Sequence, residues 1–153
     1  MLHVVVADNS TVRVYETIAL GSALVAIAAF HNPVGKHERD MVTSRPGQVI
    51  NRAAGIPQSY EPKVSARQQL TQRWLKLVGA QLQLLLTGHK SAGMILVAAP
   101  RLLAEFRRQL PTRTRALILG QLARDLTHHP VSVLTKRVQP AMRAAARAQA
   151  EGF

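Results

Sequence analysis

The run from Met94 to Ala98 contains no polar residue and narrows the choice of fold more than any other segment of the sequence. A strand that is apolar at every position needs cover on both faces, which is typical of a parallel strand inside a sheet. Pro100 follows closely and suits the first turn of a helix, where its missing N–H would have no intrahelical partner anyway. These residues therefore predict an α/β protein with helices packed on the faces of a sheet.

Further strands are indicated by short β-branched or alternating apolar segments, at residues 2–7, 11–17 and 23–30. The first two should form a hairpin, and the third is favoured as a strand over a helix because Gly21 and Pro33 bound it closely. The segment that begins at Ala116 fits either a fifth strand or a helix. The order of elements predicts one α/β domain, residues 1–153, with a five-stranded mixed sheet in which 94–98 is central and parallel to 3–7.

The clearest helix runs from Lys63 to Leu86, where apolar residues recur at helical spacing. Its core-facing stripe is predicted to be Leu70, Trp74, Leu77, Val78, Leu82 and Leu85. Shorter helices are expected at 100–110 and 130–138. Pro140 should interrupt the last of these, which leaves 140–153 as a helical or frayed tail.

Residues 31–62 show no clean periodicity and contain four prolines, Pro33, Pro46, Pro57 and Pro62. A loop of this length is uncommon inside a compact domain and is often functional. We therefore expect a site in this loop.

The net charge of +12 belongs entirely to the second part of the chain. Residues 62–153 hold 15 of the 20 basic residues and three of the eight acids, and no acid lies between 62 and 104. This pattern is either a solvated surface or a face that binds a polyanion, most naturally RNA. The candidate contacts are Lys63, Arg67, Arg73, Lys76, Arg101 and Arg108. Since the aromatic residues Trp74 and Phe106 fall on core-facing stripes, binding should rest on the nucleic-acid backbone rather than on base stacking.

Several kinds of catalytic site are disfavoured. The absence of cysteine excludes disulfides, cysteine-rich zinc sites and cysteine nucleophiles. His128 and His129 are adjacent and would not share a face of a strand or helix, and the other histidines are scattered: His3, His31, His37 and His89. The glycines form no phosphate-binding loop, so no metal and no cofactor is expected. A two-metal nuclease needs converging carboxylates, and Asp8 is better placed to cap the turn after the first strand. The other acids that such a site could use are expected on different elements, with Asp40 and Asp125 in loops and Glu105 in a helix.

Four segments, taken in order, resemble a bacterial family. They are residues 4–15 (VVVADNSTVRVY), 31–33 with 45–48 (HNP and RPGQ), 97–107 (VAAPRLLAEFR), and 124–127 with 133–134 (RDLT and VL). No single motif is specific, but their order and spacing, from about residue 3 to 138, resemble the host-attachment family, described as "protein required for attachment to host cells".

That family is similar to the middle domain of archaeal and eukaryotic peptide-chain release factors, which implies an RNase H-like α/β sheet. In that domain a Gly-Gly-Gln loop precedes a long basic helix. Here Arg45-Pro46-Gly47-Gln48 precedes one, with 14 further residues between. Gln48, in place of the family's usual arginine, strengthens the likeness to a release factor, whereas Pro46 weakens it because proline fixes φ and lacks an N–H. Ser44 and Ala104 also depart from the family pattern.

The resemblance and the charge together predict a cytosolic, non-catalytic domain that binds RNA or a ribosomal site. No signal peptide or membrane span is recognisable. One alternative is a factor that supports attachment to host cells through anionic surfaces. A second is peptidyl-tRNA hydrolysis, with Gln48 positioning water, although Pro-Gly is also an ordinary turn sequence.

Overall fold

The computed structural model describes residues 1–19, 21–33 and 60–151. Within them five strands form one mixed sheet, in the order β3-β2-β1-β4-β5. The strands are β1 (Leu2–Ala7), β2 (Thr11–Thr17), β3 (Val25–His31), β4 (Gly93–Ala98) and β5 (Ile118–Ala123). The helices are α3 (Tyr60–Gly88), α4 (Pro100–Gln109), α5 (Thr112–Ala116) and α6 (Val131–Glu151).

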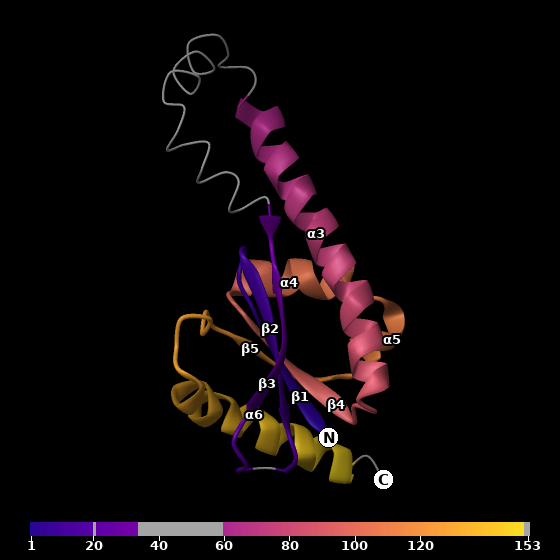
Figure 1. Cartoon of the computed structure of the whole chain (residues 1–153), viewed down its shortest axis with the longest axis vertical. Coiled ribbons are helices and arrows are strands. Elements are labelled where there is room, and N and C mark those ends of the chain that lie inside the picture. The colour runs from indigo at the N-terminus through magenta and orange to yellow at the C-terminus, as the bar shows by residue number, and fades with distance from the viewer. Residues whose placement is uncertain (20, 34–59, 152–153) are drawn as a thin grey trace.

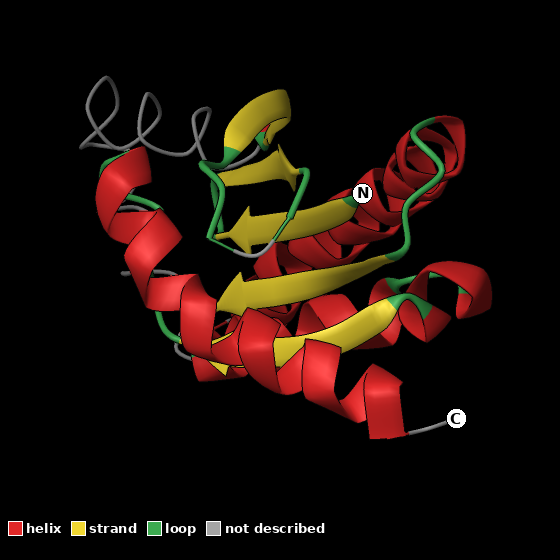
Figure 2. Cartoon of the chain, turned by 90° about the horizontal axis from the view of Figure 1, so that it is seen from below, coloured by secondary structure: helices red, strands yellow, loops and turns green. Residues whose placement is uncertain are grey.

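Helices cover both faces of the sheet, which gives three layers (Figures 1 and 2). Side chains alternate along a strand, so Val5 and Ala7 pack against α3 and α4, whereas Val4 and Val6 pack against α6. Every residue of β4 is buried. The apolar run thus has cover on both sides, and the predicted α/β class with a five-stranded mixed sheet is confirmed.

The pairing of β1 with β4 is parallel, as predicted, and β1 and β2 form an antiparallel hairpin. The central strand is nevertheless β1 and not 94–98, because β2 and β3 both lie beyond β1 while only β5 lies beyond β4. The segment after Ala116 is resolved as a strand, parallel to β4, that begins at Ile118. A one-turn helix, α5, occupies the residues immediately before it.

The buried face of α3 differs from the predicted stripe. Trp74 and Val78 are buried as predicted, but Leu77 is 66% exposed. Side chains two positions apart are rotated by about 200° around the axis of a helix. Because Leu75 is buried, Leu77 therefore points away from the sheet. Leu70 is 40% exposed, and the N-terminal part of α3 extends past the sheet (Figure 1).

The predicted break at Pro140 is wrong, since α6 continues through it from Val131 to Glu151. Proline removes the hydrogen bond to the carbonyl four residues earlier. In α6 this is the carbonyl of Lys136. Pro140 and Lys136 both lie on the exposed side of the helix, where water can donate a hydrogen bond to that carbonyl. No helix in the described part of the chain is long and apolar enough to cross a membrane.

Candidate nucleic-acid interface

The outer face of α3 carries two of the predicted contacts, Arg73 and Lys76, and both are exposed. Neither contacts a carboxylate of the described chain. Arg67, nearer the start of α3, is also exposed, but it is six residues from Arg73 and so about 120° away around the helix. The side chain of Lys63 and the whole of Arg45–Gln48 lie outside the described residues, so these predictions stay open.

Two more predicted contacts, Arg101 and Arg108, lie on the exposed side of α4. Glu105 lies between them, and its Oε2 is 3.4 Å from Nη2 of Arg108. An exposed pair of this kind contributes at most about 1 kcal/mol and is screened by salt. Arg108 can therefore exchange this carboxylate for a phosphate, and Arg101 has no acidic partner in the described chain.

The helices α3 and α4 lie on the same face of the sheet and contact each other where α4 ends. A Cβ at Gly79 would be 3.2 Å from Cδ of Pro111 and 3.3 Å from the carbonyl oxygen of Gln109, so glycine permits this close approach. The Arg115 guanidinium donates to the carbonyls of Arg108 and Leu110, at 3.3 and 3.0 Å, and so binds the end of α4. The bases of α3 and α4 thus lie on the same side of the sheet, but they do not form one continuous row.

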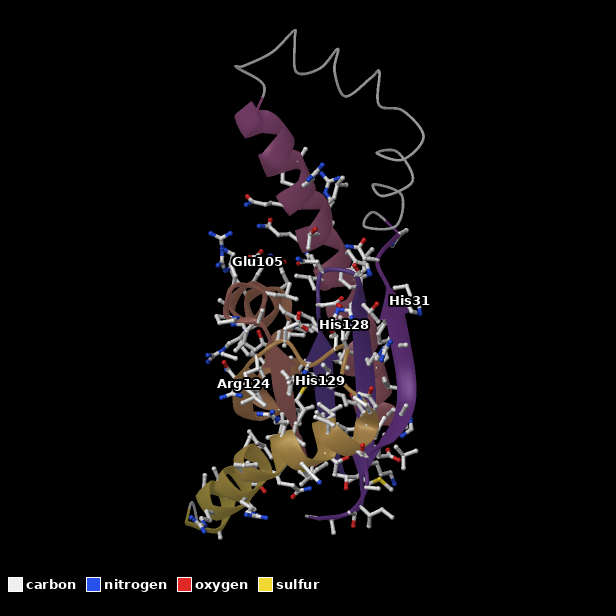
Figure 3. The ribbon with its side chains drawn as sticks, turned by 90° about the vertical axis from the view of Figure 1, so that its left-hand side faces the viewer. His31, Glu105, Arg124, His128 and His129 are labelled. Atoms are coloured by element: carbon white, nitrogen blue, oxygen red, sulfur yellow. The ribbon has the colours of Figure 1, made fainter. Side chains whose placement is uncertain are left out.

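Two of the carboxylates considered for a nuclease, Asp8 and Asp125, serve turns instead, and Asp40 lies outside the described residues. Asp8 Oδ1 accepts hydrogen bonds from the N–H groups of Ser10 and Thr11, at 2.7 and 2.6 Å, which confirms its predicted capping role. Asp125 Oδ1 accepts one from Thr127 Oγ1 at 2.7 Å, and this bond lowers the pKa of Asp125. Figure 3 shows Glu105 on α4, apart from His128 and His129, which are neighbours in the turn before α6.

Residues 3–138 match the model of a family described as "Protein required for attachment to host cells". The chain belongs to this host-attachment family. The expectation drawn from the four sequence segments is therefore confirmed. Comparison with curated proteins gives no match.

Solved structures similar to this host-attachment protein include the archaeal translation termination factor aRF1, with a TM-score of 0.51 and 13% identity over 99% of the chain. A second, titled "Archaeal protein", has a TM-score of 0.46 and 13% identity, also over 99% of the chain. The chain spans about two fifths of each, 41% and 40%. At this identity the likeness to aRF1 shows the fold alone, and that fold is release-factor-like.

A second basic surface of this host-attachment protein was not predicted. The exposed bases Lys136, Arg143 and Arg147 follow one another at steps of seven and four along α6, and so share its outer side. Helical spacing could have identified this stripe, but the expected break at Pro140 obscured it. Because α6 covers the opposite face of the sheet, this stripe is separate from the bases of α3 and α4.

The expectation that the histidines are scattered is wrong for His3 and His89. His3 on β1 pairs with Glu16 on β2, and His89 directly follows α3. All three side chains meet at the edge of the sheet where β1 and β4 begin. A hairpin with its turn at residues 8–10 could have placed His3 opposite Glu16, but no local pattern could have placed His89.

Proposed function

We propose that this protein binds RNA, free or within the ribosome, through the outer faces of α3 and α4. The exposure of Arg73, Lys76 and Arg101, in a stretch of sequence without an acid from 62 to 104, carries the proposal. Guanidinium and ammonium groups without acidic partners bind phosphate oxygens through charge-assisted hydrogen bonds. Each contact with a phosphate also releases counterions, which makes the binding strongly salt-dependent.

Burial of three of the aromatic side chains favours binding through phosphates over binding through bases. Tyr15, Trp74 and Phe106 are 4%, 7% and 0% exposed. A buried ring cannot stack on an unpaired base, so these three give no base contacts. We therefore propose a ligand recognised mainly by its backbone, with weak dependence on sequence. Ribosomal RNA is the first RNA to test, because the similar fold of aRF1 belongs to a translation termination factor.

The test is a salt titration of RNA affinity for the wild type and for Arg73→Ala/Lys76→Ala. Each lost phosphate contact should reduce the slope of log affinity against log salt by about 0.7 for a single strand and about 0.9 for a duplex. The double variant should therefore lose about 1.4 to 1.8 units of slope, to a similar extent with two unrelated RNAs. A loss limited to one RNA would indicate base readout instead.

Arg143→Ala/Arg147→Ala is the matched control, because it removes the same charge from α6 on the other face of the sheet. It should leave most of the slope unchanged. If both double variants reduce the slope equally, binding follows net charge and not the face formed by α3 and α4, and the proposal is wrong.

The family description supports one alternative, a role in attachment to host cells through anionic surfaces. The same bases would serve it, because sulfated polysaccharides and anionic lipids also present clustered negative charge. Retention on heparin or anionic vesicles, with no measurable RNA binding at low salt, would favour attachment. The second alternative, peptidyl-tRNA hydrolysis by Gln48, concerns residues outside the described part of the chain.

A further inference from the structure

Three side chains from separate segments converge at the edge of the sheet opposite the turn formed by residues 8–10. Nε2 of His3 lies 3.2 Å from Oε2 of Glu16, and Nδ1 of His89 lies 2.9 Å from the same oxygen. One potential ligand atom from each residue lies within 4.8 Å of the other two. We refer to His3, Glu16 and His89 as the His-Glu-His cluster.

The backbone holds this cluster at three fixed points. His3 and Glu16 are directly opposite each other in the β1–β2 ladder. His89 lies in the turn that ends α3, where its N–H donates to the carbonyl of Leu85 at 3.0 Å. Lys90 follows with a φ of 52°, which reverses the chain toward β4. The cluster therefore joins a hairpin to the connection between α3 and β4.

Ser91 fixes which nitrogen of His3 faces the carboxylate. Its hydroxyl donates to the carbonyl of Gly93 at 3.1 Å, and its Oγ lies 2.7 Å from Nδ1 of His3. Ser91 thus holds Nδ1 of His3 and leaves Nε2 directed at Oε2 of Glu16.

Nε2 of His3 and Nδ1 of His89 both face one carboxylate oxygen, Oε2 of Glu16. Neutral imidazole binds metal ions through a ring nitrogen, and a carboxylate supplies a negatively charged oxygen ligand. The backbone therefore holds three potential metal ligands close together.

We propose that the His-Glu-His cluster binds one Zn²⁺ ion, with Nε2 of His3, Oε2 of Glu16 and Nδ1 of His89 as ligands. Two imidazoles and one carboxylate form a known zinc ligand set that leaves a fourth position for water or another ligand. Ligand atoms around tetrahedral zinc are separated by about 3.4 Å, given bonds of about 2.0 to 2.2 Å. The separations of 2.9 and 3.2 Å already approach this value.

The surroundings also suit a metal. Ser91 holds the other nitrogen of His3, as hydrogen-bonding partners of metal-bound histidines usually do. The exposed fraction rises from 0% for His3 through 18% for Glu16 to 39% for His89, so an ion can enter from the side of His89. Bound zinc would connect β1, β2 and the end of α3, and would thereby stabilise the folded chain by mass action.

The test is calorimetric titration of untagged, EDTA-treated and dialysed protein with ZnCl2. Wild type should bind one equivalent, and its thermal unfolding temperature should rise with Zn²⁺ but not with Mg²⁺. Glu16→Gln keeps the shape of the side chain and His89→Ala changes a partly exposed residue, so both variants should fold. Each should weaken zinc binding by at least roughly 10-fold, and Ser91→Ala by roughly 10- to 100-fold.

His128→Ala/His129→Ala is the matched control, because it removes two exposed histidines from another part of the chain. It should retain the affinity of the wild type. Substituting Co²⁺ adds a spectroscopic measurement, since tetrahedral cobalt absorbs visible light far more strongly than octahedral cobalt. The proposal is overturned if wild type binds no zinc, or if Glu16→Gln and His89→Ala bind it as tightly as the control.

Discussion

Asp125 and Thr127 show how one hydrogen bond can account for a short sequence motif. These residues belong to the segment Arg124–Thr127, one of the four that resemble the host-attachment family. The carboxylate of Asp125 accepts from both the hydroxyl and the backbone N–H of Thr127, at 2.7 and 3.3 Å. Such turns use an aspartate to bond the backbone two residues later. The motif thus shapes the turn before α6 and gives no evidence of catalysis.

Thr127→Val keeps the shape of the buried side chain and removes its hydroxyl. The pKa of Asp125 should rise toward its ordinary value of 3.8, because the Thr127 hydroxyl is the main cause of its lowering. A lowered pKa stabilises the folded protein above pH 3.8, and this stabilisation is lost as the pH falls through the folded value. NMR titration of the carboxyl carbon checks the pKa. Thr135→Val, whose hydroxyl bonds only the Val131 carbonyl, should leave it unchanged.

At the scale of the element, α3 shows what periodicity can and cannot predict. Its existence, its approximate ends and the burial of Trp74 follow from the sequence, because apolar residues recur at helical spacing. The sequence does not show which of Leu75 and Leu77 is buried against the sheet, since leucines occur on more than one side of α3. Likewise, the buried strand β4 and its parallel pairing with β1 were predictable, but that β1 and not β4 is the central strand depends on pairings distant in sequence. Of the candidate interface, the exposed bases of α3 and α4 were predictable, whereas the stripe on α6 and the position of His89 were not.

The two faces of α3 should differ sharply in their contribution to stability. Trp74→Ala should lower the free energy of unfolding by about 3–5 kcal/mol, because it leaves a cavity in the core between α3 and the sheet. Leu77→Ala should change it by less than about 0.5 kcal/mol, because that side chain is mostly in water. Urea unfolding measures both. Equal losses would mean that α3 packs on the sheet with a different face.

At the scale of the whole molecule, the sheet separates two groups of exposed bases in the described part of the chain. One face carries the bases of α3 and α4, and the other carries those of α6. Uniform attraction to a polyanion would involve both faces, whereas a binding site involves one. Two of the exposed lysines, Lys76 and Lys136, lie on opposite sides of the sheet and can distinguish these possibilities.

Acetylation of lysines, followed by mass spectrometry, should therefore report the orientation of bound RNA. At low salt, saturating RNA should slow the modification of Lys76, on the outer face of α3, and leave Lys136 on α6 unchanged. The physical reason is that a phosphate in contact with an ammonium group excludes the reagent and favours the protonated, unreactive amine. Adding salt should remove the protection in parallel with the loss of affinity. Protection of Lys136 alone would move the interface to α6, and equal protection of both lysines would show that the RNA follows the charge of the molecule without occupying one face.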